Sequence, residues 1–171
     1  MISSNGDMNK YKVLFLCHHN SARSIIAQAL ATTHLSNKFQ GYSAGPVPAD
    51  SLSPYAAEII EELNYQGEAL KPKSWDVFSS PDAPKMDFII SLSDRATGED
   101  VPRWPGSPAT AHWDFPDPAH TDGTNMEIKR AYVSLLNGLQ ARIDIMAALS
   151  FDRLDKFRLQ DELKAIHQNL R

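Results

Sequence analysis

One cysteine stands at a spacing from an arginine that suits attack on a bound anion. Cys17 is the only cysteine of the chain, and five residues separate it from Arg23. A loop this short can curl so that its backbone N–H groups join those of a following helix N-terminus, which creates a site for a phosphate-like oxyanion. The guanidinium of Arg23 can bind two oxygens of that anion, with the Cys17 sulfur beneath its central atom. The predicted oxyanion-binding residues are His18, His19, Asn20, Ser21, Ala22, Arg23 and Ser24.

Other residues of this loop are given supporting roles. The dipole of the following helix and a neighbouring arginine favour the thiolate form of Cys17, which is the nucleophile. Ser24 can donate its hydroxyl to the sulfur, and Asn20 can hold the loop open because asparagine tolerates a left-handed backbone. The alternative is that Cys17 is a small buried apolar residue. His18 and His19 are interpreted as loop residues, and no metal site is predicted, because no third ligand stands at a suitable spacing.

The segments around this loop alternate between strand and helix patterns. Residues 11–16 are a mostly apolar run typical of a buried parallel strand, and residues 23–36 carry apolar side chains spaced for one buried helix face. Further strands are predicted at 39–43, 86–92 and 109–113, and further helices from Ser53-Pro54 to about Gly67, at 75–78 and at 126–149. This alternation predicts an α/β, three-layer doubly wound fold with a four-stranded parallel sheet flanked by helices. In such folds ligands bind at the carboxyl ends of the strands, where Cys17 stands.

The chain is expected to hold one domain with short additions at each end. Its 171 residues suit one well-buried domain. Residues 1–10 are predicted to be a flexible lead and residues 11–150 the domain itself. Residues 151–171 are predicted to form an amphipathic helix packed on the domain edge, with a dimer contact as the alternative.

The composition of the chain limits the cellular location and the binding partners that we expect for the protein. A net charge of −4 argues against nucleic acid or an anionic membrane as a partner, since both favour basic faces. No apolar run is long enough to span a bilayer, and the polar N-terminus lacks the hydrophobic stretch of a secretion signal. A single cysteine excludes an internal disulfide and a cysteine-based zinc site. A reducing, cytoplasmic location is therefore expected.

With these residues in place, the chain resembles the low-molecular-weight tyrosine phosphatase superfamily, and within it the arsenate reductases built on the same fold. The resemblance runs from about Val13 to Leu149. The stretches that carry it are Cys17-x2-Asn20-x2-Arg23-Ser24, Tyr42-Ser43-Ala44-Gly45, Trp104-Pro105-Gly106 and His112-Trp113-Asp114-Phe115-Pro116-Asp117-Pro118-Ala119.

The resemblance implies roles for two further residues. Asp117 would be the general acid, carried on a mobile Asp-Pro loop opposite the cysteine, and it would complete a catalytic set with Cys17 and Arg23. A carboxyl group near a bound anion and a thiolate favours its protonated form, so it can donate a proton. Alternatively, Asp117 only shapes the turn that follows it. Ser43 would bond to Asn20 and brace the loop, unless it is merely a hydroxyl at a strand end.

Two departures from the family pattern affect the expected chemistry. Reductases that recycle through an internal disulfide carry further cysteines in the stretches that match residues 91–94 and 98–102, where this chain has Ser93 and Val101. Tyrosine phosphatases of this fold follow Asp-Pro with an aromatic residue that grips the phosphotyrosine ring, where this chain has Ala119. The first departure removes intramolecular recycling, and the second weakens the case for an aromatic phosphoester.

Electron counting separates the candidate functions. Reduction of arsenate to arsenite takes two electrons and hence two thiols, and this chain has one. We expect Cys17 to form the thiol–arsenate adduct and an external thiol, such as glutathione with a glutaredoxin-like partner, to complete the reduction without any bound cofactor. One alternative is a low-molecular-weight protein tyrosine phosphatase or other phosphomonoesterase that works through a cysteinyl-phosphate, with Asp117 protonating the leaving oxygen. A second alternative is a non-catalytic domain that binds oxyanions.

Overall fold

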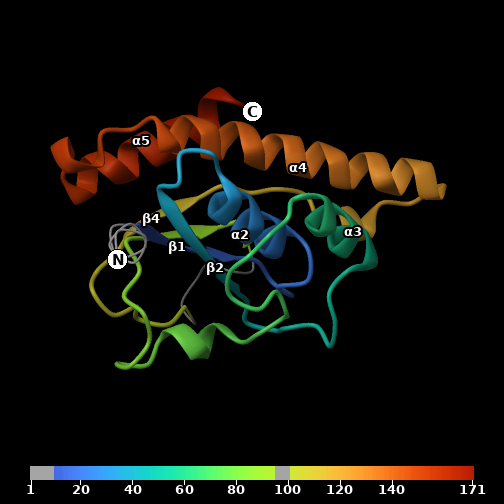
Figure 1. Cartoon of the computed structure of the whole chain (residues 1–171), viewed down its shortest axis with the longest axis horizontal. Coiled ribbons are helices and arrows are strands. Elements are labelled where there is room, and N and C mark those ends of the chain that lie inside the picture. The colour runs from blue at the N-terminus through green and yellow to red at the C-terminus, as the bar shows by residue number, and fades with distance from the viewer. Residues whose placement is uncertain (1–9, 95–100) are drawn as a thin grey trace.

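A parallel sheet forms the centre of the molecule. The computed structural model describes residues 10–94 and 101–171, and within them four strands pair in parallel in the order β2-β1-β3-β4 (Figure 1). The strands are β1 (Tyr11–Leu16), β2 (Phe39–Ala44), β3 (Phe88–Ser91) and β4 (Ala109–His112). The helices are α2 (Arg23–Thr33), α3 (Pro54–Glu62), α4 (Asn125–Ala147) and α5 (Lys156–Asn169), with short 3-10 turns η1 (Trp75–Phe78), η3 (Pro118–His120) and η4 (Phe151–Arg153). The predicted α/β fold with a four-stranded parallel sheet is confirmed.

Strand β1 lies where the order of the strands reverses. The chain passes from β1 to β2 on one side and later places β3 on the other side. In register, Leu16 pairs with Ala44 of β2 and with Ser91 of β3. At such a switch point the loops after neighbouring strands leave the sheet in different directions and open a crevice at the carboxyl ends. Cys17, the first residue after β1, therefore begins in that crevice.

The helices of this chain differ in whether a side chain caps their N-terminus. Helix α3 begins after Ser53, whose hydroxyl accepts a backbone hydrogen bond, and Pro54 occupies its first turn as predicted. Helix α4 begins with a capping box in which Thr124 and Glu127 satisfy each other's backbone N–H groups. Helix α2 differs, because its N-cap residue is Ala22, which has no side chain that can accept a hydrogen bond. The first amides of α2 are therefore left for other acceptors.

Three helices are clearly shorter than predicted. Helix α5 covers Lys156–Asn169 instead of residues 151–171, because Phe151–Arg153 form the separate 3-10 turn η4 before it. Helix α2 ends at Thr33 instead of residue 36, because the next residue, His34, has an extended backbone with ψ 137°. Helix α3 ends at Glu62 instead of near Gly67, because Asn64 adopts the left-handed conformation with φ 53° soon after it.

The two faces of the sheet are covered in different ways. Helices α2, α4 and α5 cover one face, and their apolar side chains enclose a core around Phe15 and Ile90. In Figure 1, α4 runs along the top of the molecule and α5 continues from its left end. The other face is covered by η1 and the irregular segments around it, with Trp75 and Phe78 in the same cluster as Leu14. Among the described residues, long helices therefore cover only one face of the sheet.

The C-terminal helix α5 packs against the edge of the sheet. Helix α5 packs against β4 and α4, and the indole Nε1 of Trp113 donates a hydrogen bond to the carbonyl oxygen of Leu163 over 2.8 Å.

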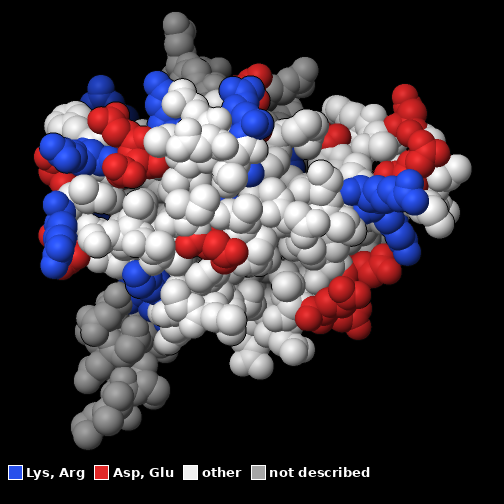
Figure 2. Space-filling view, turned by 90° about the horizontal axis from the view of Figure 1, so that it is seen from above, with Lys and Arg blue, Asp and Glu red and all other residues white. Residues whose placement is uncertain are grey.

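Figure 2 shows positive and negative side chains interspersed around the face seen from above. Across residues 10–94 and 101–171, no helix is both long and apolar enough to cross a membrane. The predicted flexible lead lies outside the described residues, apart from Lys10.

Candidate active site

The loop after β1 turns several carbonyl groups toward a neighbouring segment. Three of its carbonyl oxygens accept hydrogen bonds from backbone N–H groups of residues 47–53. The pairs are His18 with Val47 (3.1 Å), His19 with Ala49 (2.9 Å) and Ser21 with Ser53 (3.0 Å). In a trans peptide the next N–H group points the opposite way, so the N–H groups of His19, Asn20 and Ala22 point away from that segment. This geometry supports the predicted cradle of amide donors.

The sulfur of Cys17 lies against the first turn of α2. Its Sγ atom is 2.9 Å from the hydroxyl oxygen of Ser24 and 3.4 Å from the backbone nitrogen of Ser24. The Ser24 hydroxyl accepts a hydrogen bond from the side-chain amide of Asn20 over 2.7 Å, so its own proton can be donated to the sulfur. Two donors then point at Sγ, so the sulfur has polar partners at the start of α2. The alternative that Cys17 is only a buried apolar residue does not account for these polar partners.

Asn20 connects this loop to the backbone of Lys73. It is fully buried and has φ 48°, the left-handed conformation that the sequence predicted for it. Its Oδ1 accepts a hydrogen bond from the backbone N–H of Lys73 over 2.9 Å, which fixes the orientation of the amide and aims Nδ2 at Ser24. Gly45 approaches the same loop closely, because a Cβ atom there would lie 2.3 Å from the carbonyl oxygen of Cys17.

The predicted partner of Ser43 is wrong. The Ser43 hydroxyl donates to Oε1 of Gln28 over 2.6 Å, while Asn20 is bonded to Ser24 and Lys73. Gln28 is fully buried on α2, and its side-chain nitrogen donates to the hydroxyl of Tyr65 over 2.9 Å. A buried amide needs such partners, so the hydroxyl at the end of β2 satisfies α2 instead of the cysteine loop.

Arg23 links the cysteine loop, residues 17–23, to the segment of residues 114–120 that carries Asp117, which we call the acid loop. Its Nη1 donates to the carbonyl oxygen of Phe115 over 3.1 Å, and its Nη2 lies 3.5 Å from Oδ2 of Asp117. Asp117 also caps η3, because its Oδ1 accepts a hydrogen bond from the N–H of Ala119 over 3.0 Å. The side chains of Arg23 and Asp117 are mostly buried. An oxyanion that binds Arg23 therefore competes with the Asp117 carboxylate for the same guanidinium.

A pocket of about 480 Å³ opens next to this pair. It is lined by His18, His19, Arg23, Ser93, Asp94, Asp114, Phe115, Pro116, Asp117 and His120. The pocket thus brings together four of the predicted site residues. Cys17 is not among the lining residues and is only 2% exposed. Access of an oxyanion to the sulfur therefore requires side chains to move, and the lining residues that belong to the Cys-x5-Arg loop are His18, His19 and Arg23.

Three groups at this pocket were missed by the sequence analysis. The Nε2 atom of His120 lies 3.9 Å from Oδ2 of Asp117. His120 follows Asp117 by three residues, and this short spacing could have indicated the contact. The hydroxyl of Ser93 is buried and has no hydrogen-bond partner among the described residues. The carbonyl group of Phe115, which binds Arg23, gave no signal, because every residue has a carbonyl.

The pKa values of two groups near the pocket, Asp114 and His167, are lowered from their ordinary values. A hydrogen bond from His167 holds the pKa of the Asp114 carboxyl below its usual value, and the charge of Arg171 acts in the same direction. Burial lowers the pKa of His167, although its bond to Asp114 opposes that shift. Among the described side chains, no group of three or more His, Cys, Asp or Glu residues is placed to hold a metal ion.

Comparisons with known proteins agree with this architecture. The sequence profile of the low molecular weight phosphotyrosine protein phosphatase family matches residues 12–147. An arsenate reductase of Halalkalibacterium halodurans is 31% identical over 120 residues, which are 70% of this chain and 83% of that protein. An arsenate reductase of Shouchella clausii is 30% identical over 136 residues, which are 80% of this chain and 94% of that protein.

A solved structure described as an arsenate reductase in the phosphate binding state has the same fold. It superposes with a TM-score of 0.61 at 24% identity and covers 81% of this chain and 97% of its own. The chain belongs to the low molecular weight phosphotyrosine protein phosphatase family, in the branch that contains the arsenate reductases.

Proposed function

We propose that the protein reduces arsenate to arsenite, with Cys17 as the nucleophile and an external thiol as the second sulfur donor. The observation that carries this proposal is the presence of a single thiol in a chain of the arsenate reductase branch. Reduction of arsenic(V) to arsenic(III) takes two electrons, which two thiols supply as they form a disulfide. One of those thiols must therefore come from another molecule.

In the first step the Cys17 thiolate attacks arsenic. A sulfur–arsenic bond forms and an arsenic–oxygen bond breaks, and the Asp117 carboxyl supplies the proton that lets the oxygen leave as water. The inward N–H groups of the loop and the guanidinium of Arg23 hold the remaining oxygens and stabilise the charge that develops on them. The contacts of Ser24 with Sγ and of Arg23 with Asp117 support these roles, because they link nucleophile, cradle and acid.

In the second step an external thiolate attacks the Cys17 sulfur. A sulfur–sulfur bond forms, the sulfur–arsenic bond breaks, and its electron pair stays on arsenic, which leaves as arsenite. A second external thiol then reduces the mixed disulfide, with a glutaredoxin-like protein as the natural exchange partner, and restores the Cys17 thiolate. The cytoplasm, where such thiols are kept reduced, is the setting that suits this cycle.

Phosphomonoester hydrolysis is the second candidate function. The matching family profile is named for phosphotyrosine phosphatases, and the same thiolate, cradle and acid can form and hydrolyse a cysteinyl-phosphate. Ala119 at the position after Asp117-Pro118 argues against a phosphotyrosine substrate, because no aromatic ring stands there to stack on the substrate. Arsenate reduction is therefore the favoured function.

Product analysis tests the proposal. The full chain is incubated with arsenate, glutathione and a glutaredoxin, and arsenite is measured by chromatography with elemental detection. Parallel samples contain a thioredoxin system in place of glutathione, or phenyl phosphate in place of arsenate, and Cys17→Ser is the control. We expect arsenite with an external thiol, none without it, and none from the control.

Other outcomes point to the alternatives. No arsenite with any thiol, beside rapid cleavage of the aryl phosphate, would make the protein a phosphatase. Inertness in both assays together with tight binding of inorganic phosphate would make it an oxyanion-binding domain.

A further inference from the structure

Helix α5 lies beyond residues 12–147, which the family profile matches, yet it touches the loop that carries the acid. His167 on α5 is only 5% exposed, and its Nε2 lies 2.8 Å from Oδ1 of Asp114. Asp114 stands three residues before Asp117 and lines the same pocket. The C-terminal addition to the family domain therefore reaches the active-site pocket through one buried imidazole.

The hydrogen bonds of His167 define its tautomer. Nε of Arg142 on α4 can only donate, and it lies 2.9 Å from Nδ1 of His167, so Nδ1 is the acceptor. The ring proton of the neutral imidazole is then on Nε2, which donates it to the Asp114 carboxylate. The guanidinium of Arg142 is itself held by the carbonyl oxygen of Gly138 over 2.9 Å. The imidazole thus joins α4, α5 and the acid loop.

Phe115 receives support from the same elements. Its ring lies under the Arg142 guanidinium, with 4.7 Å between the guanidinium carbon and the ring centroid, and 5.9 Å from the His167 ring. A Cβ atom at Gly138 would lie 2.8 Å from its ring carbon Cε1, so α4 passes close to the ring. Its backbone carbonyl is the acceptor for Arg23. Asp114 and Phe115 directly precede Pro116 and Asp117 in the chain, so a displacement of Asp114 or of the Phe115 ring changes the position of Asp117.

We propose that α5, acting together with Arg142 of α4, positions the acid loop, so that the His167–Asp114 bond and the Arg142–Phe115 contact place Asp117 for proton transfer. This inference rests on the proposed function in so far as Asp117 is the general acid. His167 acts through Asp114 and does not touch the oxyanion, so its loss slows proton transfer and leaves oxyanion binding to the cysteine loop.

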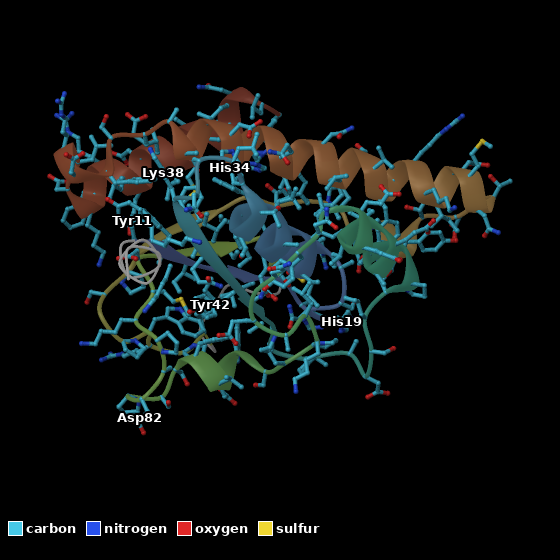
Figure 3. All side chains as sticks on the ribbon, in the orientation of Figure 1. Tyr11, His19, His34, Lys38, Tyr42 and Asp82 are labelled. Carbon is cyan, nitrogen blue, oxygen red and sulfur yellow. The ribbon has the colours of Figure 1, made fainter. Side chains whose placement is uncertain are left out.

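The molecule contains a matched pair that serves as a control. His34 at the end of α2 lies 2.8 Å from Oδ1 of Asp144 on α4, the same distance as in the His167–Asp114 pair. His34 follows the last turn of α2, whereas the cysteine loop precedes its first turn, and Figure 3 labels His34 near α4 and His19 of the loop away from it. Removal of either histidine breaks one histidine–aspartate bond, but only one of the two bonds reaches the acid loop.

The first experiment measures kinetics of four variants of the full chain: His167→Ala, Asp114→Ala, Asp114→Asn and His34→Ala. We expect His167→Ala and Asp114→Ala to lower kcat about 10-fold with little change in KM, because a misplaced catalytic group loses transition-state stabilisation. Asp114→Asn keeps an acceptor for Nε2 and should recover most of the activity, and His34→Ala should behave like the wild type. With aryl phosphates the loss should be larger for phenyl than for 4-nitrophenyl phosphate, because the poorer leaving group depends more on the acid.

The second experiment measures hydrogen exchange, which does not require activity. We expect faster exchange of the amides at 114–120 in His167→Ala than in the wild type, and no such change in His34→Ala. Equal kcat and equal exchange at 114–120 in the two histidine variants would overturn the inference. If His167→Ala fails to fold, wild-type kcat in Asp114→Ala would overturn it as well, since the Asp114 side chain is partly exposed and its removal leaves the core intact.

The two experiments separate this inference from the proposed function. A wild type that makes no arsenite contradicts the proposed function, while the exchange pattern still decides the role of α5. An active wild type whose His167→Ala and His34→Ala variants are alike contradicts only the role of α5.

Discussion

The cysteine loop and the acid loop are held in place by different kinds of contact. Around the sulfur, Ser24 and Asn20 lie within seven residues of Cys17, and the backbone of residues 47–53 supports them. The acid loop is held by groups from distant parts of the chain: Arg23 of α2, Leu92 after β3, Arg142 of α4 and His167 of α5. The nucleophile is thus placed mainly by its own motif, whereas the acid is placed by the assembled fold. Substitutions in the cysteine loop should therefore abolish catalysis, whereas substitutions around the acid loop should lower the catalytic rate only partially.

The largest effect is expected from the sulfur itself. Cys17→Ser should lower the turnover of arsenate or aryl phosphate by about 10⁴-fold or more, because removal of a nucleophile leaves only the residual catalysis of the binding site. The serine hydroxyl can still accept the hydrogen bonds from Ser24, so the thermal unfolding midpoint should stay close to that of the wild type. Measurable turnover well above this level would show that another group is the nucleophile.

Asp117→Asn should have the next largest effect. An amide cannot deliver a proton, so we expect kcat to fall by about 10²-fold or more, in the range of general acid catalysis. Loss of the negative charge also removes the competitor for Arg23, so inorganic phosphate should bind at least as tightly as to the wild type. Steady-state kinetics with phosphate as the inhibitor measure both quantities. A variant with full kcat would restrict Asp117 to capping η3.

The sequence predicted the region that is built locally. A strand, a polar loop and a helix occur together at residues 11–33, and the left-handed backbone of Asn20 follows from the preferences of asparagine itself. Ser43 was assigned the wrong partner because the competing acceptor, Gln28, lies on a helix whose rotation against β2 no local pattern specifies.

The support of the acid loop could not be predicted from the sequence. The apolar stripe of 151–170 indicated a helix packed on the edge of the domain, and α5 is present there. His167 and Asp114 are 53 residues apart in the chain, and both are polar residues in stretches whose pattern concerns apolar packing. Their contact depends on the angle at which α5 crosses β4, which only the tertiary packing fixes.

A third prediction concerns the stability of the cysteine loop. Asn20→Ala should lower the free energy of unfolding by about 3 kcal/mol, because it leaves the partly buried N–H of Lys73 without its acceptor, removes the donor to Ser24 and places alanine in a left-handed conformation. Asn37→Ala is the matched control, since Asn37 has a similar φ of 56° but is exposed. The control should lose only about 1 kcal/mol, the cost of the left-handed backbone. Equal losses in chemical denaturation would show that the Asn20 side chain does not brace the loop.

The smallest expected effect is a pH dependence of stability around the acid loop. Burial lowers the pKa of His167 in the folded chain, with Arg142 and Arg171 acting in the same direction and Asp114 opposing them. Below the ordinary histidine value of about 6.5 the unfolded chain therefore binds more protons than the folded chain. The free energy of unfolding should fall as the pH drops from about 6.5 toward the lowered pKa of His167, before Asp114, whose pKa is also lowered, loses its contribution below about 3.9.

His167→Gln removes the titrating ring but keeps a donor and an acceptor, so it isolates this contribution. The stability difference between the wild type and His167→Gln should shrink as the pH is lowered from about 7.5 to about 5.5 in denaturant titrations. His34→Gln is the matched control for the loss of a histidine–aspartate bond. A difference that is constant across this range would mean that the imidazole of His167 keeps the same protonation in both states, and the acid loop would then be supported through geometry alone.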